Sequence, residues 1–119
     1  MELNTVQRKA VEHVDGPMLV IAGAGAGKTR VVTHRIAYLI ELGIPPSKIL
    51  AHTITNKAAQ EMKTRVNELS GGVVLATTFH SFGVRVLRET IDSLGYKKSF
   101  TIYDDNDVEK ILKECLKQQ

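Results

Sequence analysis

Residues 22–29 read AGAGAGKT, a composition and spacing that suit the binding of phosphate groups. Small side chains let consecutive backbone N–H groups curl into a concave nest around a phosphate. A helix that begins near Lys28 adds the positive end of its dipole at the same place. Lys28 can reach the β- and γ-phosphates of a nucleotide, and the Thr29 hydroxyl can ligate Mg²⁺. The stretch therefore predicts a nucleotide-binding loop with a magnesium ligand at Thr29.

The first position of the loop departs from the strict pattern, which begins with Gly, because Ala22 stands there. This position mainly needs a small residue at the end of a strand, so Ala is tolerated. The alternative interpretation is a flexible Gly/Ala connector, but the apolar run before the loop and the helical pattern after it favour nucleotide binding. The predicted nucleotide-binding residues of this stretch are Ala22, Gly23, Ala24, Gly25, Ala26, Gly27, Lys28, Thr29 and Arg30.

Two further segments carry small polar residues where predicted strands end and helices begin. Their sequences are TITNKAAQEMKTRV (53–66) and TTFHSFGVRVLR (77–88). Hydroxyls and free N–H groups at such places are good contacts for nucleic-acid phosphates, but each segment alone is equally consistent with ordinary helix capping. Gln7 also has two interpretations, which are compatible. Its amide can read adenine through a paired donor and acceptor, or it can complete a capping box with Asn4.

An α/β fold is predicted to position these groups. Short apolar runs at 18–22, 48–54 and 73–77 indicate strands, and the first lacks alternation, as expected for a strand buried on both faces of a parallel sheet. Their alternation with helical patterns predicts a parallel sheet with helices on both faces. The predicted helices are one capped by Asn4 that runs to Val14, one with an apolar stripe from Val31 to Ile40, one capped by Asn56, one that ends at Gly95 and one capped by Asp104.

The last two predicted helices each carry an apolar stripe that we expect to face a core. In the helix before Gly95 the stripe consists of Phe82, Val86, Leu87, Ile91 and Leu94, and in the last helix it consists of Val108, Ile111, Leu112 and Cys115.

The composition is that of a globular domain, with 119 residues, of which 43% are hydrophobic and 24% charged. No apolar run is long enough to cross a bilayer, and the polar start of the sequence is not a secretory signal. A single cysteine, Cys115, fits a reducing cytosol, so we expect a cytoplasmic protein. The net charge of +3 permits nucleic-acid binding without demonstrating it.

Four motifs together closely resemble the amino-terminal part of superfamily 1 DNA helicases of the UvrD/Rep/PcrA type. They are LNxxQ, AGAGxGKT, TxTNKAAxEMxxR and TFHS, in the order and spacing of that family. The resemblance runs from Leu3 to about Leu116. It implies a P-loop NTPase fold of the RecA-like kind and an ATP-dependent 3′-to-5′ DNA helicase, with ATP and Mg²⁺ as cofactors and single-stranded DNA as partner.

The resemblance also implies roles for individual residues. Gln7 would read adenine, and Arg35 matches an arginine that lies near the base, with a solvated helix arginine as the alternative. Lys28 and Thr29 would take part in catalysis by holding the triphosphate and Mg²⁺. Ile54 stands where the family usually has Phe, so we expect apolar contact there instead of base stacking. The residues that would contact DNA are Thr53, Ile54, Asn56, Lys57, Thr78, Phe79, His80 and Ser81.

The sequence is expected to hold part of a motor, with residues 1–88 as ATP-binding subdomain and 89–119 as the start of an inserted helical subdomain. The family's Asp-Glu-x-x-Asp run is missing. In FTIYDD (100–105) the two acids suit a helix start better than catalysis. Because the sequence ends in mid-helix, we expect a fragment whose partner is the remainder of the helicase chain. Alone, it should neither hydrolyse ATP efficiently nor unwind DNA.

An open sheet edge at the predicted strand 18–22 is expected to promote self-association. Two other functions stay open at this point. One is a stand-alone module that binds nucleotide or single-stranded DNA, and the other is a small P-loop kinase, for which the sequence offers no visible acceptor pocket or arginine-rich lid.

Overall fold

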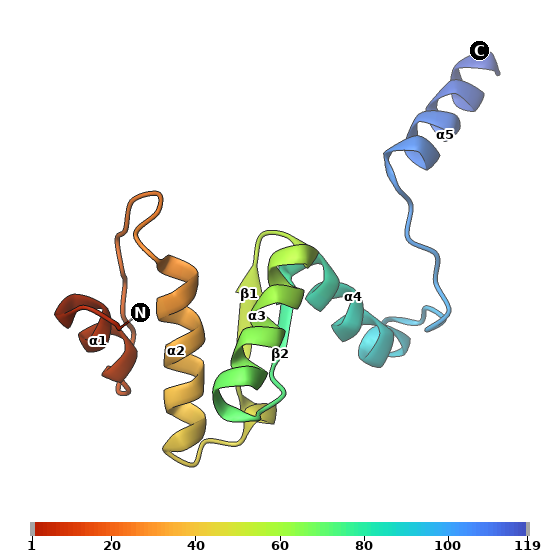
Figure 1. Ribbon diagram of the computed structural model, residues 1–119. Coiled ribbons are helices and arrows are strands. Elements are labelled where there is room, and N and C mark those ends of the chain that lie inside the picture. The colour runs from red at the N-terminus through yellow and green to blue at the C-terminus, as the bar shows by residue number, and fades with distance from the viewer. Residues whose placement is uncertain (1, 119) are drawn as a thin grey trace. The chain divides into compact units, whose positions relative to one another are not determined.

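The computed structural model describes residues 2–118, which form two compact units, one extending to Phe82 and one beginning at Gly83. Figure 1 shows the elements, with η marking 3-10 helices. In chain order they are α1 (Thr5–Glu12), α2 (Lys28–Glu41), η1 (Pro46–Lys48), β1 (Leu50–Thr53), α3 (Asn56–Ser70), β2 (Leu75–Thr78), α4 (Phe79–Thr90), η2 (Ile91–Leu94) and α5 (Asp105–Lys117).

The first unit contains a two-stranded parallel sheet made of β1 and β2. The register pairs Leu50 with Leu75 and Thr53 with Thr78, so both strands end at the same edge. Helix α3 connects the strands and packs against both of them. This β-α-β unit confirms the predicted α/β class and parallel pairing, as well as the two strands expected within 48–54 and 73–77.

The core of the first unit lies between α3, the sheet and α2. Val66 of α3 is fully buried, and Ile36 of α2 reaches the same cluster. A smaller cluster of Ala10, Val11 and Val31 holds α1 against α2. The main cluster consists of Ile36, Ala51, Ala59, Met62, Val66, Val74 and Ala76.

The predicted strand at 18–22 is wrong, because the structure gives this segment no regular secondary structure. Leu19 and Ile21 are 86% and 91% exposed, so their side chains do not lie inside a sheet. A strand needs a neighbour to take up its backbone N–H and C=O groups. Within the described residues the sheet contains β1 and β2 alone. Figure 1 draws the segment as a coil between α1 and the loop that leads into α2.

Helices on both faces of the sheet, which the sequence also predicts, are not found within residues 2–118. Ala51 and Ala76 belong to the buried cluster under α3. Strand residues alternate between faces, and Leu50 and His52, which point the other way from Ala51, are exposed. The sheet of this unit is therefore covered by α3 on one face, whereas on the other face the rings of Phe79 and Phe82, at the start of α4, contact His52 and leave Leu50 exposed.

The second unit has no buried residue on α5 or on the part of α4 that it contains. The inward stripes predicted for these helices are therefore wrong for this structure. Val86 and Leu94 are 41% and 70% exposed, and Val108 and Leu112 of α5 are 46% and 58% exposed. The amphipathic patterns do form helices, and Phe82, the first residue of the stripe on α4, is half-buried beside His52 of β1. The stripe residues of the second unit are not buried.

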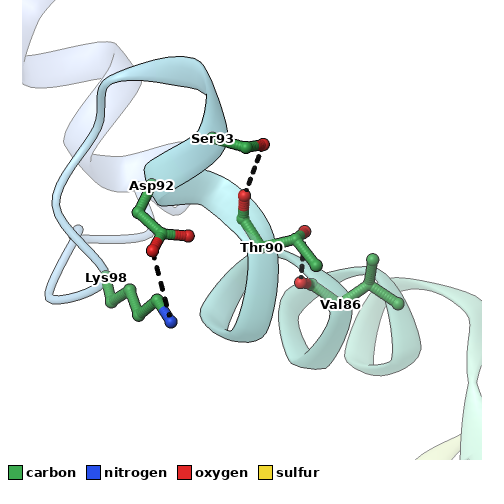
Figure 2. A network of polar contacts seen from close by, with 5 residues as sticks. All are labelled: Val86, Thr90, Asp92, Ser93 and Lys98. Atoms are coloured by element: carbon green, nitrogen blue, oxygen red, sulfur yellow. Dashed lines mark hydrogen bonds and ion pairs between the residues drawn. The ribbon is translucent and has the colours of Figure 1, made fainter.

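Polar contacts shape the end of α4 and the turn that follows, as Figure 2 shows. The Thr90 hydroxyl donates to the Val86 carbonyl at 2.8 Å, and the Ser93 hydroxyl donates to the Thr90 carbonyl at 2.8 Å. An ion pair of 3.5 Å joins Lys98 to Asp92. These side-chain bonds to the backbone accompany the change from α-helix to the 3-10 turn η2.

The two acids of FTIYDD open α5, which confirms their interpretation as a helix start. The Asp104 carboxylate accepts a hydrogen bond from the Asp107 N–H at 2.8 Å, and Asp107 accepts one from the Asp104 N–H at 3.1 Å. Asp105 is the first residue of the helix, where a negative charge is favourable. A membrane-spanning helix is not found among residues 2–118.

Candidate nucleotide and nucleic-acid sites

The loop at 22–29 makes a tight turn that depends on glycine. Gly25 and Gly27 have φ angles of 73° and 79°, a left-handed conformation that is costly for residues with a Cβ atom. The Ala26 N–H donates to the Gly23 carbonyl at 3.3 Å and closes the turn. A Cβ atom on Gly27 would also lie 3.1 Å from the Gln7 Nε2 atom. Glycine at position 27 therefore serves both the backbone conformation and the close approach of a side chain.

The N-terminus of α2 has no side-chain cap, since Gly27 occupies the N-cap position. By contrast, side-chain oxygens of Asn4, Thr55 and Asp104 accept hydrogen bonds from the first turns of α1, α3 and α5. The first N–H groups of a helix have no partner within the helix and carry the positive end of its dipole. At α2 no side-chain cap competes for this end of the helix with an anion such as a phosphate.

Lys28 folds back over the loop that precedes it. Its Nζ atom donates to the Gly23 carbonyl at 2.9 Å and lies 3.4 Å from the Ala22 carbonyl. The ammonium therefore lies beside the small residues where the predicted phosphate nest would be. Thr29 is exposed in the first turn of α2, and Arg30 is half-buried next to it.

Gln7 links α1 to the loop. Its Oε1 atom accepts from the Asn4 N–H at 2.9 Å, and the Asn4 side chain accepts from the Gln7 N–H at 2.8 Å, which confirms the predicted capping box. The Gln7 Nε2 atom donates to the Ala26 carbonyl at 3.1 Å. The same amide therefore completes the capping box of α1 and binds the loop, 19 residues further along the chain.

Arg35 of α2 is half-buried and ties α2 to the end of α1. Its Nη1 atom donates to the Ala10 carbonyl at 2.9 Å and also to the His13 carbonyl. These carbonyls lie at the C-terminus of α1, where a positive charge is favourable. Arg35 is therefore not a solvated helix arginine, because its guanidinium group contacts the protein backbone.

A cavity of about 650 Å³ brings together six of the predicted nucleotide residues, whereas the other five do not line it, namely Ala24, Gly25, Gly27, Thr29 and Arg30. It is lined by Gln7, Lys28 and Arg35, by the loop residues Ala22, Gly23 and Ala26, and by apolar side chains that include Val6, Val31 and Val32. Ligand pockets in proteins commonly have volumes of several hundred Å³ and combine apolar walls with a few polar groups. Size, apolar walls and convergent polar groups therefore all suit a nucleotide-sized ligand.

The predicted DNA-contacting residues of both segments meet at the carboxyl edge of the sheet. Thr53 and Thr78 are paired in the register. The Thr78 hydroxyl donates to Ser81 Oγ at 2.9 Å, Ser81 Oγ donates to Asn56 Oδ1 at 3.2 Å, and the Ser81 N–H donates to Thr78 Oγ1 at 3.2 Å. These bonds join the start of α3 to the start of α4.

Exposed apolar and basic side chains lie next to the residues of this polar network in the chain. Ile54 and Phe79 are 97% and 76% exposed, and Lys57 and His80 are exposed as well. The His52 ring lies 5.9 Å from the Phe79 ring and 5.4 Å from the Phe82 ring, measured between centroids. The edge therefore offers stacking surface, hydroxyl groups and a lysine within one region of the first unit.

Two contacts at this edge differ from the prediction or were not predicted from the sequence. Thr55, and not Asn56, caps α3, since its hydroxyl accepts from the Ala58 N–H at 3.1 Å. Asn56 is thereby free to accept from Ser81, a contact that only the fold brings about. A Thr-Asn pair before a helical pattern signals an N-cap at either residue, so the sequence left that choice undetermined.

Comparisons with known proteins identify relatives of this chain. The family model of the UvrD/REP helicase N-terminal domain matches residues 3–119. Two proteins named ATP-dependent DNA helicase PcrA, from Staphylococcus aureus strain Mu50 and Staphylococcus epidermidis strain RP62A, are each 50% identical over an aligned length of 121 residues. The alignments cover 98% of this chain and 17% of each relative. The chain thus spans less than a fifth of the length of these relatives.

Proposed function

The chain belongs to the UvrD/REP helicase N-terminal domain family, and from this premise we propose that it is the nucleotide-binding part of an ATP-dependent DNA helicase motor. The proposed fold type is the P-loop, RecA-like NTPase. The observation that carries the proposal is the cavity in which Gln7, Lys28, Arg35 and the loop come together. Neither a stand-alone module nor a small kinase is favoured by a particular contact of the described residues.

The residues around the cavity fit ATP with Mg²⁺. The uncapped N-terminus of α2 and the ammonium of Lys28 suit the phosphates, and the Thr29 hydroxyl suits Mg²⁺ together with phosphate oxygens. The Gln7 amide suits the adenine edge. Arg35, which lies on the cavity wall, suits the region of the base. When bound, Mg²⁺ neutralises phosphate charge, which is the chemistry that phosphoryl transfer requires.

Single-stranded DNA is the proposed partner of the carboxyl edge of the sheet. Asn56 and Lys57 offer amide and ammonium donors to phosphates. Thr53, Thr78 and Ser81 lie beside them, and their hydroxyl protons, which are donated within the protein here, would turn to phosphate oxygens when DNA binds. Ile54, Phe79 and His80 offer exposed surface to bases. A flat aromatic side chain supports any base through stacking, so this part of the contact would not depend on sequence.

Hydrolysis needs a carboxylate that holds Mg²⁺ and another group that orients water. The 119 residues contain no Asp-Glu-x-x-Asp run, and Asp104 and Asp107 are engaged in a capping box. We therefore assign binding of ATP and DNA to this chain and efficient turnover to an assembly with further motor residues. The 3′-to-5′ direction of movement is part of the same proposal.

The DNA contact is tested by titrating a fluorescent oligo-dT at two salt concentrations, with Phe79→Ala as the variant. We expect affinity to fall with salt, because phosphate contacts release counterions. Phe79→Ala should weaken binding roughly fivefold or more, the equivalent of losing ~1–3 kcal/mol of stacking. Leu94→Ala is the matched control, since Leu94 is 70% exposed but lies far along the chain from this edge. Salt-independent binding, or equal affinity of the Phe79 variant and wild type, would contradict the proposal.

A further inference from the structure

We propose that His52 holds the Phe79 ring where that ring can stack on a DNA base, so that His52 is a positioning residue for single-stranded DNA. The inference rests on the proposed function, because it concerns how the Phe79 side chain is prepared for its contact with DNA. His52 belongs to β1 and Phe79 opens α4, so only the fold brings the two rings together.

His52 is a polar residue inside a short strand, on the side of the sheet that faces away from the core. Ala51 is buried in the cluster under α3, and strand residues alternate between faces, so the side chain of His52 lies on the opposite face. Within residues 2–118 its imidazole is not hydrogen-bonded, and its ring contacts are with Phe79 and Phe82. The imidazole is therefore linked to the start of α4 by its contacts with these two rings.

The geometry of the three rings is the one that aromatic side chains prefer. The centroids of His52 and Phe79 are 5.9 Å apart with 45° between the ring planes, and those of His52 and Phe82 are 5.4 Å apart with 77° between the planes. Tilted and edge-to-face pairs at such distances stabilise a structure beyond the area that they bury. Because Phe82 is half-buried and Phe79 is 76% exposed, His52 joins the exposed ring to one that is packed against the protein.

Phe79 needs such a contact to be ordered before DNA binds. Its backbone is placed by the cap of α4, in which the Thr78 hydroxyl accepts from the Ser81 N–H at 3.2 Å, but its side chain is too exposed to be fixed by the core. Ordering a free side chain on binding costs conformational entropy, and a ring that is already held avoids part of that cost. The contact with His52 orders the Phe79 ring and still leaves most of it open for a base.

A direct contact between the imidazole nitrogen atoms and a phosphate is the alternative role for His52, and substitutions separate the two roles. His52→Ala removes the ring, whereas His52→Phe keeps an aromatic ring and deletes both nitrogen atoms. Positioning through Phe79 requires the ring alone, so His52→Phe should preserve DNA affinity. Leu50→Ala is the matched control, because Leu50 is exposed on the same face of β1 but lies at the other end of the strand.

The experiment measures the dissociation constant of a fluorescent oligo-dT for the full chain in a double-mutant cycle of His52→Ala and Phe79→Ala. His52→Ala should weaken binding about two- to tenfold when Phe79 is present, the effect of one aromatic pair, and less than about twofold in the Phe79→Ala background. A purely structural role of His52 would instead weaken binding equally in both backgrounds. His52→Phe and Leu50→Ala should each stay within about twofold of wild type.

His52→Gln provides a second variant without a ring, with a polar side chain that suits an exposed position. It should weaken binding as much as His52→Ala does, because the nitrogen and oxygen atoms of its amide do not replace the ring contact with Phe79. Wild-type affinity of His52→Gln would overturn the proposal even if His52→Ala did not fold.

Equal losses from His52→Ala in both backgrounds, or no loss in either, would overturn the positioning role and leave the proposed function intact. A loss in His52→Phe as large as that in His52→Ala would overturn it as well, in favour of direct contact through the imidazole nitrogen atoms. Equal affinity of Phe79→Ala and wild type, or salt-independent binding, would instead overturn the proposed DNA contact, and this inference with it.

Discussion

The Lys28 ammonium has three donors, of which the contacts to the Ala22 and Gly23 carbonyls use two. One donor remains for a phosphate oxygen while the side chain stays against the loop. Gly25 and Gly27 allow the backbone turn that brings these carbonyls to Lys28. Lys28 is thus a point charge held by the same loop whose N–H groups would bind the phosphates.

Replacing Lys28 by alanine should weaken ATP binding about 10- to 100-fold, the equivalent of losing a charge-assisted hydrogen bond of ~1.5–3 kcal/mol. Equilibrium titration with a fluorescent ATP analogue measures the loss. Lys48→Ala is the control, because Lys48 is an exposed lysine of η1 outside the cavity. Equal ATP affinity of the Lys28 variant and wild type would contradict the assigned role.

At the scale of elements, helix starts organise the edge that we assign to DNA. Thr55 caps α3 and Thr78 caps α4, since their hydroxyls accept from the Ala58 and Ser81 N–H groups. The sequence left helix capping open as an alternative to DNA contact. The structure shows that both threonines do cap a helix. The Thr78 hydroxyl still has its proton and donates it to Ser81, so the cap also orders the polar network at the sheet edge.

Thr78→Ala should reduce the free energy of unfolding by ~1 kcal/mol, because the variant loses the N-cap of α4. Urea denaturation followed by circular dichroism measures the change. Thr78→Ser retains the hydroxyl and should recover most of the stability. A serine variant as unstable as the alanine variant would show that the methyl group, and not the cap, is what matters.

Local signals in the sequence predicted much of the fold. The capping box at Asn4, the cap at Asp104 and the apolar stripe of α3 depend on neighbours within a turn or two of helix, so they can be read from the sequence. The strand predicted at 18–22 and the inward faces of α4 and α5 depend on partners that a local pattern does not specify. Gln7 illustrates both cases, because its capping box is local whereas its bond to Ala26 crosses 19 residues.

At the scale of the whole molecule, the exposed segment 18–22 is expected to promote association between copies of this chain. Leu19 and Ile21 are almost fully exposed, and the backbone groups of this segment lie outside the described sheet. Exposed apolar segments with unpaired backbone groups invite pairing with a second copy. We therefore expect this chain to self-associate in a concentration-dependent manner.

Ile21→Lys should shift the chain towards monomer in sedimentation velocity, because a lysine on such a segment opposes pairing. Leu94→Lys, a change at another exposed apolar residue, should leave association largely unchanged. A monomeric wild type, or equal effects of both substitutions, would count against pairing through residues 18–22.

The central claim is that the first unit binds two ligands at two places, ATP beside the loop and single-stranded DNA at the carboxyl edge of the sheet. Backbone amide hydrogen exchange, measured with Mg·ATP and separately with oligo-dT, tests this most directly. The account predicts that ATP slows exchange at residues 23–30, that oligo-dT slows exchange at residues 53–57 and 78–82, and that Lys28→Ala abolishes the first effect and preserves the second. Unchanged exchange at residues 23–30 under saturating ATP would contradict it.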